Sequence, residues 1–145
     1  QKCTAATEML RQIVFAPQPE FDMVKSVAAR ALVQLSRTSL NDTSMVIEIL
    51  DNGTYGSKEG ALDALGYDKM LPSEEIQRSI IAKCVSFGES RPRGMMDPRY
   101  GLAAACAGWS HGIVKEFLED CLKADDTPLQ YVASNSLKGK YVKLR

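Results

Sequence analysis

The stretch from Asp97 to Trp109 has the sequence Asp-Pro-Arg-Tyr-Gly-Leu-Ala-Ala-Ala-Cys-Ala-Gly-Trp, and the organisation of the chain follows from it. Asp97 can cap a helix, and Pro98 suits the first helical position. Ala103 and Ala107 are four residues apart and share one face of such a helix. A helix with alanine on its buried face can approach its neighbours closely. The stretch therefore predicts a helix in the middle of a stack, with other helices on both sides.

The same spacing of small and apolar residues recurs along the chain, at offsets of 30, 42 and 30 residues. The four pairs are Ala31 and Leu35, Ala61 and Leu65, Ala103 and Ala107, and Ala133 and Leu137. Between them lie apolar doublets four residues apart, the second of which begins at Ile13, Ile49, Cys84 and Phe117. Self-similarity at a fixed period of about 20–50 residues indicates stacked repeats. The repeating unit is a helix with apolar doublets, a turn and a helix with an alanine seam.

This pattern resembles the HEAT-like repeats, including the short type found in bilin lyases, and the resemblance covers nearly the whole chain. It lies in the pattern of the helices and in no signature motif. The resemblance implies an all-α fold, a right-handed α-α superhelix of the HEAT/armadillo-like solenoid kind with about four helical hairpins. We therefore expect a single HEAT-like repeat domain over residues 1–145, with approximate repeats at 1–38, 39–70, 71–110 and 111–145.

Cap, glycine and proline residues divide the chain into expected helices. Their approximate spans are 4–15, 21–36, 44–50, 57–65, 73–87, 97–109, 113–123 and 127–137. The second helix is expected to bury one apolar stripe, formed by Phe21, Val24, Val27, Ala28, Ala31, Leu32 and Leu35, with Lys25, Arg30 and Gln34 off it. Gly60, inside the fourth helix, indicates close packing. Ser73 is expected to cap the fifth helix, and Thr127 with Pro128 to begin the eighth as Asp97 and Pro98 begin the sixth.

Charge and hydropathy exclude several classes of protein. The chain has 18 basic and 18 acidic residues, and its formal net charge is zero. Neither half carries a broad positive field that would hold a nucleic-acid backbone, so no nucleic-acid partner is expected. No apolar run reaches 18 residues, so no membrane span is expected. The start at Gln1 fits a mature form, a domain of a longer chain or an expressed segment equally well.

The four cysteines are too sparse for a disulfide scaffold. Cys84, Cys106 and Cys121 lie on expected apolar faces, where free cysteine packs as a small hydrophobe, and Cys3 is the one expected to be exposed. No cysteine pair has metal-ligand spacing, and one histidine cannot complete a zinc site. We expect three buried thiols, no metal and no cofactor.

The sequence contains no convincing catalytic cluster. His111, the single histidine, lies in an expected turn beside Ser110 and near Cys106. A nucleophile–histidine pair is conceivable there, but sequence neighbours on a turn rarely align in that way, which favours a turn histidine. Phosphate-binding glycine loops and the common hydrolase motifs are absent from the sequence. We therefore predict no catalytic residues and expect the chain not to be an enzyme.

Two regions are candidate binding surfaces. The long 88–100 connection expands the repeat spacing and carries Arg91, Arg93, Met95 and Met96 before Arg99 and Tyr100. Arginine forks suit carboxylate or phosphate and methionines suit apolar groups, although a solvated loop is the alternative. The resemblance also implies that the second helices line a concave groove with the exposed polar residues Arg30, Gln34, Lys58, Asp63, Arg99, Tyr100 and Gln130.

These features favour a non-catalytic helical-repeat scaffold that binds a protein or peptide, with acidic partners among those expected. Two alternatives belong to other classes. One is a helical-repeat enzyme or nucleic-acid-binding protein, of the bilin lyase or DNA glycosylase kind, which the zero net charge and the missing catalytic cluster disfavour. The other is a structural segment of a larger solenoid, whose end faces would be apolar and would need neighbours.

Overall fold

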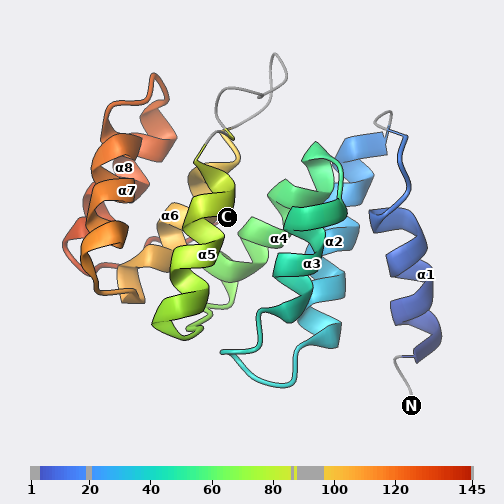
Figure 1. The fold of residues 1–145 in the computed structure, drawn as a ribbon. Helices are drawn as coiled ribbons and strands as arrows, with labels where there is room; N and C mark the ends of the chain where they lie inside the picture. Colours follow the sequence, from blue (N-terminus) through green and yellow to red (C-terminus); the bar gives the residue numbers. More distant parts are fainter. Residues whose placement is uncertain (1–3, 19–20, 86, 88–96, 145) are drawn as a thin grey trace.

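A computed structural model describes residues 4–18, 21–85, 87 and 97–144, and shows helices joined by turns (Figure 1). The described residues form eight α-helices and a short 3₁₀ helix, and they contain no β-strand. The elements are α1 (Thr4–Val14), α2 (Asp22–Ser36), α3 (Ser44–Asn52), α4 (Tyr55–Tyr67), α5 (Glu74–Cys84), α6 (Arg99–Ala105), η3 (Cys106–Gly108), α7 (Gly112–Leu122) and α8 (Thr127–Leu137). The predicted all-α class is confirmed.

The even-numbered helices form a row, in which α2 packs against α4, α4 against α6 and α6 against α8. Helices α1, α3 and α7 each lie against the even-numbered helix that follows them. Figure 1 shows α1 at one end of the molecule and α7 with α8 at the other. The chain after α8 returns to the middle, where Tyr141 and Leu144 meet Gly66 and Lys69 near the end of α4.

Side-chain caps account for two of the helix starts. Ser73 caps α5, as predicted, by accepting a hydrogen bond at 3.4 Å from a backbone N–H of the first turn. The cap of α8 is Asp126, whose carboxylate accepts from the Leu129 N–H at 2.9 Å. The prediction that Thr127 has this role is wrong, because Thr127 is already helical. Pro128 then lies in the first turn, where its missing N–H leaves no hydrogen bond unmade.

The contact between α2 and α4 brings two backbones together. Gly56 and Gly60 lie on the side of α4 that faces α2, and a Cβ at either position would overlap the main chain of Asp22 or Ser26. Further along the row, a Cβ at Gly101 would fall 2.5 Å from a backbone carbonyl oxygen of α4. Glycine allows this approach because it has no side chain. The predicted close packing at Gly60 is confirmed.

The predicted alanine seam is correct at the first position of the pair in three helices and wrong for α2. Ala61, Ala103 and Ala133 are fully buried, but of their partners only Leu65 is buried, whereas Ala107 is half-buried and Leu137 is 37% exposed. Ala31 is only partly buried, and the side chain of Leu35 is 43% exposed. The buried residues of α2 are Lys25, Ala28, Ala29, Leu32 and Val33.

The error is a shift of three residues. Because α2 begins at residue 22 and α4 at residue 55, equivalent positions lie 33 residues apart and not 30. Ala28 and Leu32 therefore correspond to the buried Ala61 and Leu65 of α4. The prediction that Phe21, Val24 and Val27 are buried is wrong: they are 65%, 56% and 65% exposed, and the neighbouring Met23 is 77% exposed.

Three helix boundaries differ from the prediction for reasons of packing. Helix α4 begins at Tyr55 and not at residue 57, and the Tyr55 ring meets the edge of Phe87 at a centroid distance of 5.9 Å. Helix α5 ends at Cys84 and not at residue 87. Helix α6 ends at residue 105 and continues as η3, because Trp109 leaves in an extended conformation and donates from Nε1 to the Met70 carbonyl oxygen at 3.0 Å.

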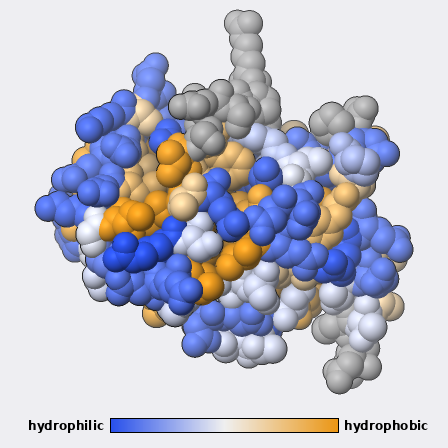
Figure 2. Space-filling model, viewed as in Figure 1, coloured by the Kyte–Doolittle hydropathy of each residue, from blue (hydrophilic) through white to orange (hydrophobic). Residues whose placement is uncertain are grey.

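The odd-numbered helices form a polar surface. Figure 2 shows that the face over α3, α5 and α7 is largely hydrophilic, with hydrophobic residues visible between the helices. Ion pairs join neighbouring helices there, between Arg11 and Glu48 at 2.6 Å and between Lys83 and Asp51 at 2.6 Å. Within the described part of the chain, no helix combines the length and the apolar composition needed to cross a membrane.

The α2–α4 contact can be tested with Gly60→Ala. In an exposed helix this change stabilises by about 1 kcal/mol, because alanine is the better helix former. Here the added methyl overlaps the Ser26 main chain, so we expect a net loss of about 1–3 kcal/mol in the free energy of unfolding. Gly112→Ala is the control, since a Cβ at the start of α7 meets nothing within 4 Å. If urea denaturation gave the same free energy of unfolding for both variants and the wild type, it would contradict the backbone contact between α2 and α4.

Candidate functional site

Two residues of the predicted concave groove connect α2 to the end of α4. The Arg30 guanidinium lies 4.6 Å from the centroid of the Tyr67 ring, within the range of a cation–π contact. Gln34 Nε2 donates to Asp68 Oδ1 at 3.3 Å. Arg37, at the end of α2, forms an ion pair with the same carboxylate at 2.9 Å. These side chains therefore bridge neighbouring helices of the row.

The α4 residues of the predicted groove also contact other parts of the protein. Lys58 Nζ lies 5.6 Å from the centroid of the Phe87 ring. Asp63 is partly buried, and its backbone lies next to Gly101 of α6. Lys58 and Arg30 thus each pair with an aromatic ring of the protein itself.

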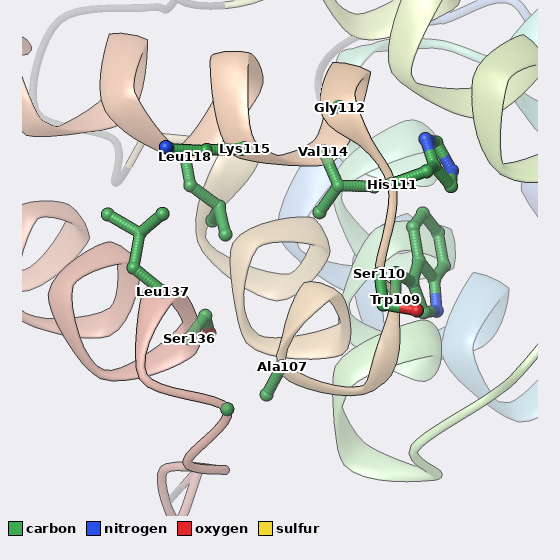
Figure 3. A pocket seen from close by; sticks show the side chains of 11 residues that line it. Ala107, Trp109, Ser110, His111, Gly112, Val114, Lys115, Leu118, Ser136 and Leu137 are labelled. Atoms are coloured by element: carbon green, nitrogen blue, oxygen red, sulfur yellow. The ribbon is translucent and has the colours of Figure 1, made fainter.

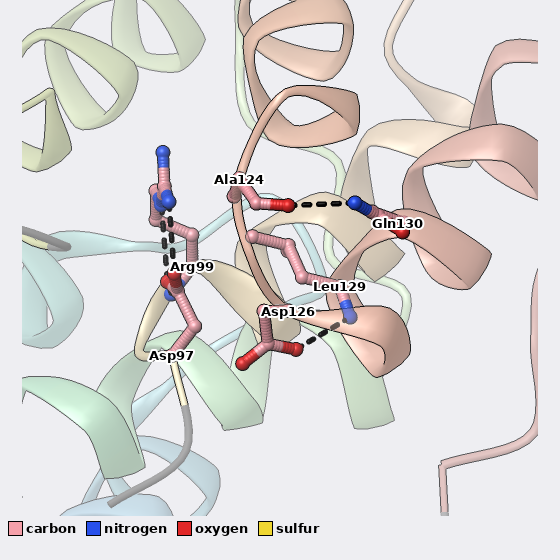
Figure 4. A network of polar contacts seen from close by, with 6 residues as sticks. All are labelled: Asp97, Arg99, Ala124, Asp126, Leu129 and Gln130. Atoms are coloured by element: carbon pink, nitrogen blue, oxygen red, sulfur yellow. Dashed lines mark hydrogen bonds and ion pairs between the residues drawn. The ribbon is translucent and has the colours of Figure 1, made fainter.

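Arg99 is held by a carboxylate two residues away (Figure 4). Its Nε and Nη2 donate to the two carboxylate oxygens of Asp97 at 3.0 and 2.8 Å, and its backbone N–H donates to the same group at 3.0 Å. The Arg99 side chain is 15% exposed. The hydrogen bond to Asp97 raises the pKa of Arg99 above its ordinary value. A partner's acidic group at Arg99 would therefore compete with an internal pair.

The remaining predicted residues fall into two groups. Gln130 Nε2 donates to the Ala124 carbonyl oxygen at 2.7 Å (Figure 4), and Tyr100 packs against the core. Arg91, Arg93, Met95 and Met96 lie outside the described residues. Binding by the 88–100 loop therefore stays a prediction.

A pocket of about 510 Å³ lies between α7, α8 and the turn before α7 (Figure 3). Figure 3 shows Lys115 and Leu137 on one side and Trp109 and His111 on the other. The pocket thus combines apolar side chains with the His111 imidazole, the Lys115 ammonium group and two serines, and none of its lining residues is a carboxylate.

The histidine of this region is bound to a glutamine of α5. His111 Nε2 lies 2.8 Å from Gln77 Oε1, and Gln77 Nε2 donates to the Pro72 carbonyl oxygen at 2.8 Å. Because the glutamine oxygen can only accept, His111 Nε2 is the donor. The nearby Cys106 is buried, and burial raises its pKa well above the ordinary value of a thiol. His111 Nδ1, the nitrogen left as acceptor, is buried without a hydrogen-bond partner, so no hydroxyl or thiol of the described residues is paired with this histidine.

An apolar surface that the sequence analysis placed in the core lies on the outside of α1 and α2. We call it the end face; its residues Met9, Phe21, Met23, Val24 and Val27 are each more than half exposed. Because an α-helix turns by about 100° per residue, Val24 lies opposite the Asp22 and Ser26 side of α2 that faces α4, and Met23 and Val27 lie on the flank between the two. An alignment of the first residues of α2 and α4, in place of the alanine pairs, would have revealed this surface. In that alignment the shift is 33 residues, and Met23 and Val27 occupy the positions of Gly56 and Gly60.

A groove of about 370 Å³ opens in the end face between α1 and α2. It is lined by Gln12, Ile13, Ala16, Gln18, Phe21, Val24 and Lys25. Lys25 was expected to lie off the buried face, but it is 2% exposed. Its Nζ donates to the carbonyl oxygens of Ala16, at 2.7 Å, and of Gln18. These bonds give hydrogen-bond partners both to the buried ammonium group and to the carbonyl oxygens of the turn after α1. The rest of the groove wall is mainly apolar.

Four charged residues of α1 and α2 are directed to other parts of the protein. Arg11 pairs with Glu48, Asp22 accepts from the Thr54 hydroxyl at 2.8 Å, and Lys25 and Arg30 have the contacts described above. The hydrogen bond to Glu48 raises the pKa of Arg11, and the charge of the nearby Glu8 adds to this. The described part of the end face is therefore largely apolar, with the exposed Glu8 next in sequence to Met9.

The opposite end of the row has a different character. The exposed residues of α7 include Lys115, Glu116, Glu119 and Asp120. Helix α8 exposes Tyr131 and Leu137 among polar residues. Among the described residues, the two ends of the row therefore differ: one exposes mainly apolar side chains, and the other exposes several charged ones.

The thiols are inert by burial. Cys84, Cys106 and Cys121 are free and buried, as predicted, while Cys3 lies outside the described residues. Burial raises the pKa of Cys84 and of Cys121 to about 12. Within the described ranges, no group of three or more His, Cys, Asp or Glu side chains is placed to hold a metal ion.

Comparison of the chain with protein-family models, curated proteins and solved structures finds no match. The resemblance to HEAT-like repeats therefore depends on the pattern of helices and apolar residues alone. The function has to be inferred from the surfaces of the chain itself.

The raised pKa of Cys84 predicts a loss of stability in alkali. The neutral thiol stabilises the fold fully below the unfolded-state pKa of about 9, and this contribution is lost as the pH rises toward 12. Above pH 9, one such thiol lowers the free energy of unfolding by up to about 1.4 kcal/mol per pH unit. Denaturation across this range should give a shallower decline for Cys84→Ala than for the wild type. Equal slopes would contradict the burial of this thiol.

Proposed function

We propose that this chain is a non-catalytic helical-repeat protein of the HEAT-like kind that binds another polypeptide through its end face. The observation that carries the proposal is the exposure of Phe21, Met23, Val24 and Val27 on one side of α2. Terminal repeats of a solenoid normally have a polar outer face. A contiguous exposed apolar face is typical of a protein contact surface.

The order of contacts in the fold supports the repeat architecture. Helices α2, α4, α6 and α8 pack in chain order, as neighbouring units of stacked repeats do. Backbone contacts at Gly56, Gly60 and Gly101 make the row rigid, because the helices meet without flexible side chains between them. A rigid row can hold the end face in a fixed shape for a partner.

The second-helix groove has less support than the end face. Arg30 contacts Tyr67, Gln34 contacts Asp68, and Arg99 is paired with Asp97. A partner that used these groups would have to replace contacts already made within the protein. The exposed side chains of the end face are apolar, so a partner covers them without displacing a hydrogen bond or an ion pair.

The two alternative functions can be weighed against the same geometry. A further repeat packed on α2 as closely as α2 packs on α4 would require small residues at positions 23 and 27, where the chain has methionine and valine. A looser contact, like that of α8 with α6, needs no glycine in the added helix, so the apolar end face also fits a segment of a larger solenoid. An enzyme has less support, because His111 Nδ1 is paired with no nucleophile of the described residues and the three described thiols are buried with raised pKa values.

Site-specific photo-crosslinking tests the proposal. A benzophenone amino acid at position 27, in cells that naturally make the chain, should give a covalent adduct with a polypeptide, because a bound partner lies within reach of this side chain. Position 123 is the matched control, since Lys123 is exposed at the charged end of the row. If position 27 gives no more adduct than position 123, the proposal is wrong.

A further inference from the structure

We propose that the end of α4, beside α6, is a second binding surface, which takes an extended peptide and is covered in this structure by the chain's own residues 140–144. We call these residues the strap. The partner is an extended segment of another polypeptide that carries an aromatic residue and, three positions later, a leucine. The inference goes beyond the proposed function, because this surface lies away from the end face.

Leu144 of the strap fills a recess that a glycine leaves open. The strap leaves α8 through a turn at Gly139, which has a φ of +72°, and runs back toward the middle of the row (Figure 1). Leu144 is 9% exposed. Its Cδ1 lies 2.9 Å from the point that a Cβ of Gly66 would occupy, and the Cβ of Ala104 lies 3.2 Å from the same point. A side chain at position 66 would therefore take the place of Leu144.

The second anchor of the strap is Tyr141, three residues before Leu144. Lys69 Nζ lies 4.9 Å from the centroid of the Tyr141 ring, within the range of a cation–π contact. Lys69 follows the end of α4 with a φ of +50°, and it is the one non-glycine residue with positive φ among the described residues. Glycine takes this conformation more readily, so the helix end alone does not account for a lysine. The contact with the aromatic ring does account for it.

The strap is held by side chains and not by its backbone. Residues 141–144 form no hydrogen bond and no ion pair with the described part of the chain. Val142 packs against the core but is only partly buried, and Lys140 and Lys143 are exposed. Helix α8 ends at Leu137, before the strap begins. Residues 141–144 can therefore leave the surface without breaking a hydrogen bond or a helix.

The surface under the strap can hold a peptide other than the strap. A cavity of about 300 Å³ is lined by Gly66, Tyr67 and Lys69 together with residues 141–144, so the strap does not fill the space around it. Release of the strap would expose the recess at Gly66 and the ammonium group of Lys69. These two features recognise an aliphatic side chain and an aromatic ring three residues apart. A foreign segment with both side chains at this spacing meets the same two features.

The strap would regulate access to this surface. Because it is part of the same chain, it competes with a foreign peptide at a high effective concentration. A partner then has to bind more tightly than the strap, or the strap has to be released first. The surface is therefore closed to weak partners and open to partners that match the two anchors.

Methyl NMR of the full chain tests whether the strap is docked and removable. Leu144→Gln should shift the resonance of the buried Ala104 methyl, because it empties the recess. Lys143→Gln is the matched control: it places the same side chain at the exposed neighbouring position and should leave this resonance unchanged. Circular dichroism should show that both variants are folded. An unshifted Ala104 methyl, or an unfolded Leu144→Gln variant, would overturn the proposal.

A synthetic peptide with the sequence of residues 138–145, Lys-Gly-Lys-Tyr-Val-Lys-Leu-Arg, is the probe for the exposed surface. Titrated to millimolar concentration into the Leu144→Gln variant, it should return the Ala104 methyl to its wild-type position and reach saturation. The wild type should need a peptide concentration about tenfold higher or more, because its own strap competes. A peptide with glutamine in place of the leucine should not bind. No binding to the variant, or equal binding to variant and wild type, would overturn the proposal.

Lys69→Gly in the Leu144→Gln background tests recognition of the aromatic ring. Glycine suits the positive φ at the end of α4, so the fold should remain intact while the cation–π contact is lost. The affinity for the synthetic peptide should fall several-fold. Lys123→Gly, which removes the same charge at an exposed position of the far end of the row, should leave the affinity unchanged. Equal effects of the two changes would overturn the aromatic part of the proposed pattern.

Discussion

The fold depends on a backbone-to-backbone contact between α2 and α4. Gly56 and Gly60 allow α4 to lie directly on the main chain of Asp22 and Ser26. The contact sets more than a distance, because it also fixes the rotation of α2 about its own axis. With residues 22 and 26 turned toward α4, Val24 lies on the opposite side of α2, and Met23 and Val27 lie on the flank next to it. The two glycines of α4 thus help to determine which apolar residues of α2 are exposed.

The same rotation determines how the first turn is built. It carries Lys25 inward, where an ammonium group without hydrogen-bond partners would be costly. The carbonyl oxygens of Ala16 and Gln18 supply those partners and are themselves held in place by the lysine. The turn after α1 is therefore tied to α2 at the base of the end-face groove. The Lys25 side chain thus links the packing of the core to the shape of a candidate binding surface, and it brings a charge into the interior.

The sequence predicted the helices and the close contact at Gly60, but not the face that α2 presents. Helix α2 has apolar residues on two sides, one through Ala28 and Leu32 and the other through Val27 and Ala31. Periodicity cannot choose between two apolar stripes on one helix. The choice is made by neighbouring helices, far away in sequence. The partners of Arg30 and Arg99 were missed for a related reason, since their contacts depend on tertiary placement and on the conformation of a helix start.

The central claim is that the apolar side of α2 is exposed, because the contact with α4 lies on another side of the helix. Methyl NMR with a soluble gadolinium chelate measures this directly, because relaxation reports how closely solvent approaches each methyl group. In the purified chain the Met23 methyl should be relaxed as strongly as the methyls of Val85, which is exposed elsewhere, and the buried Met70 should stay protected. A Met23 methyl as protected as that of Met70 would contradict the account.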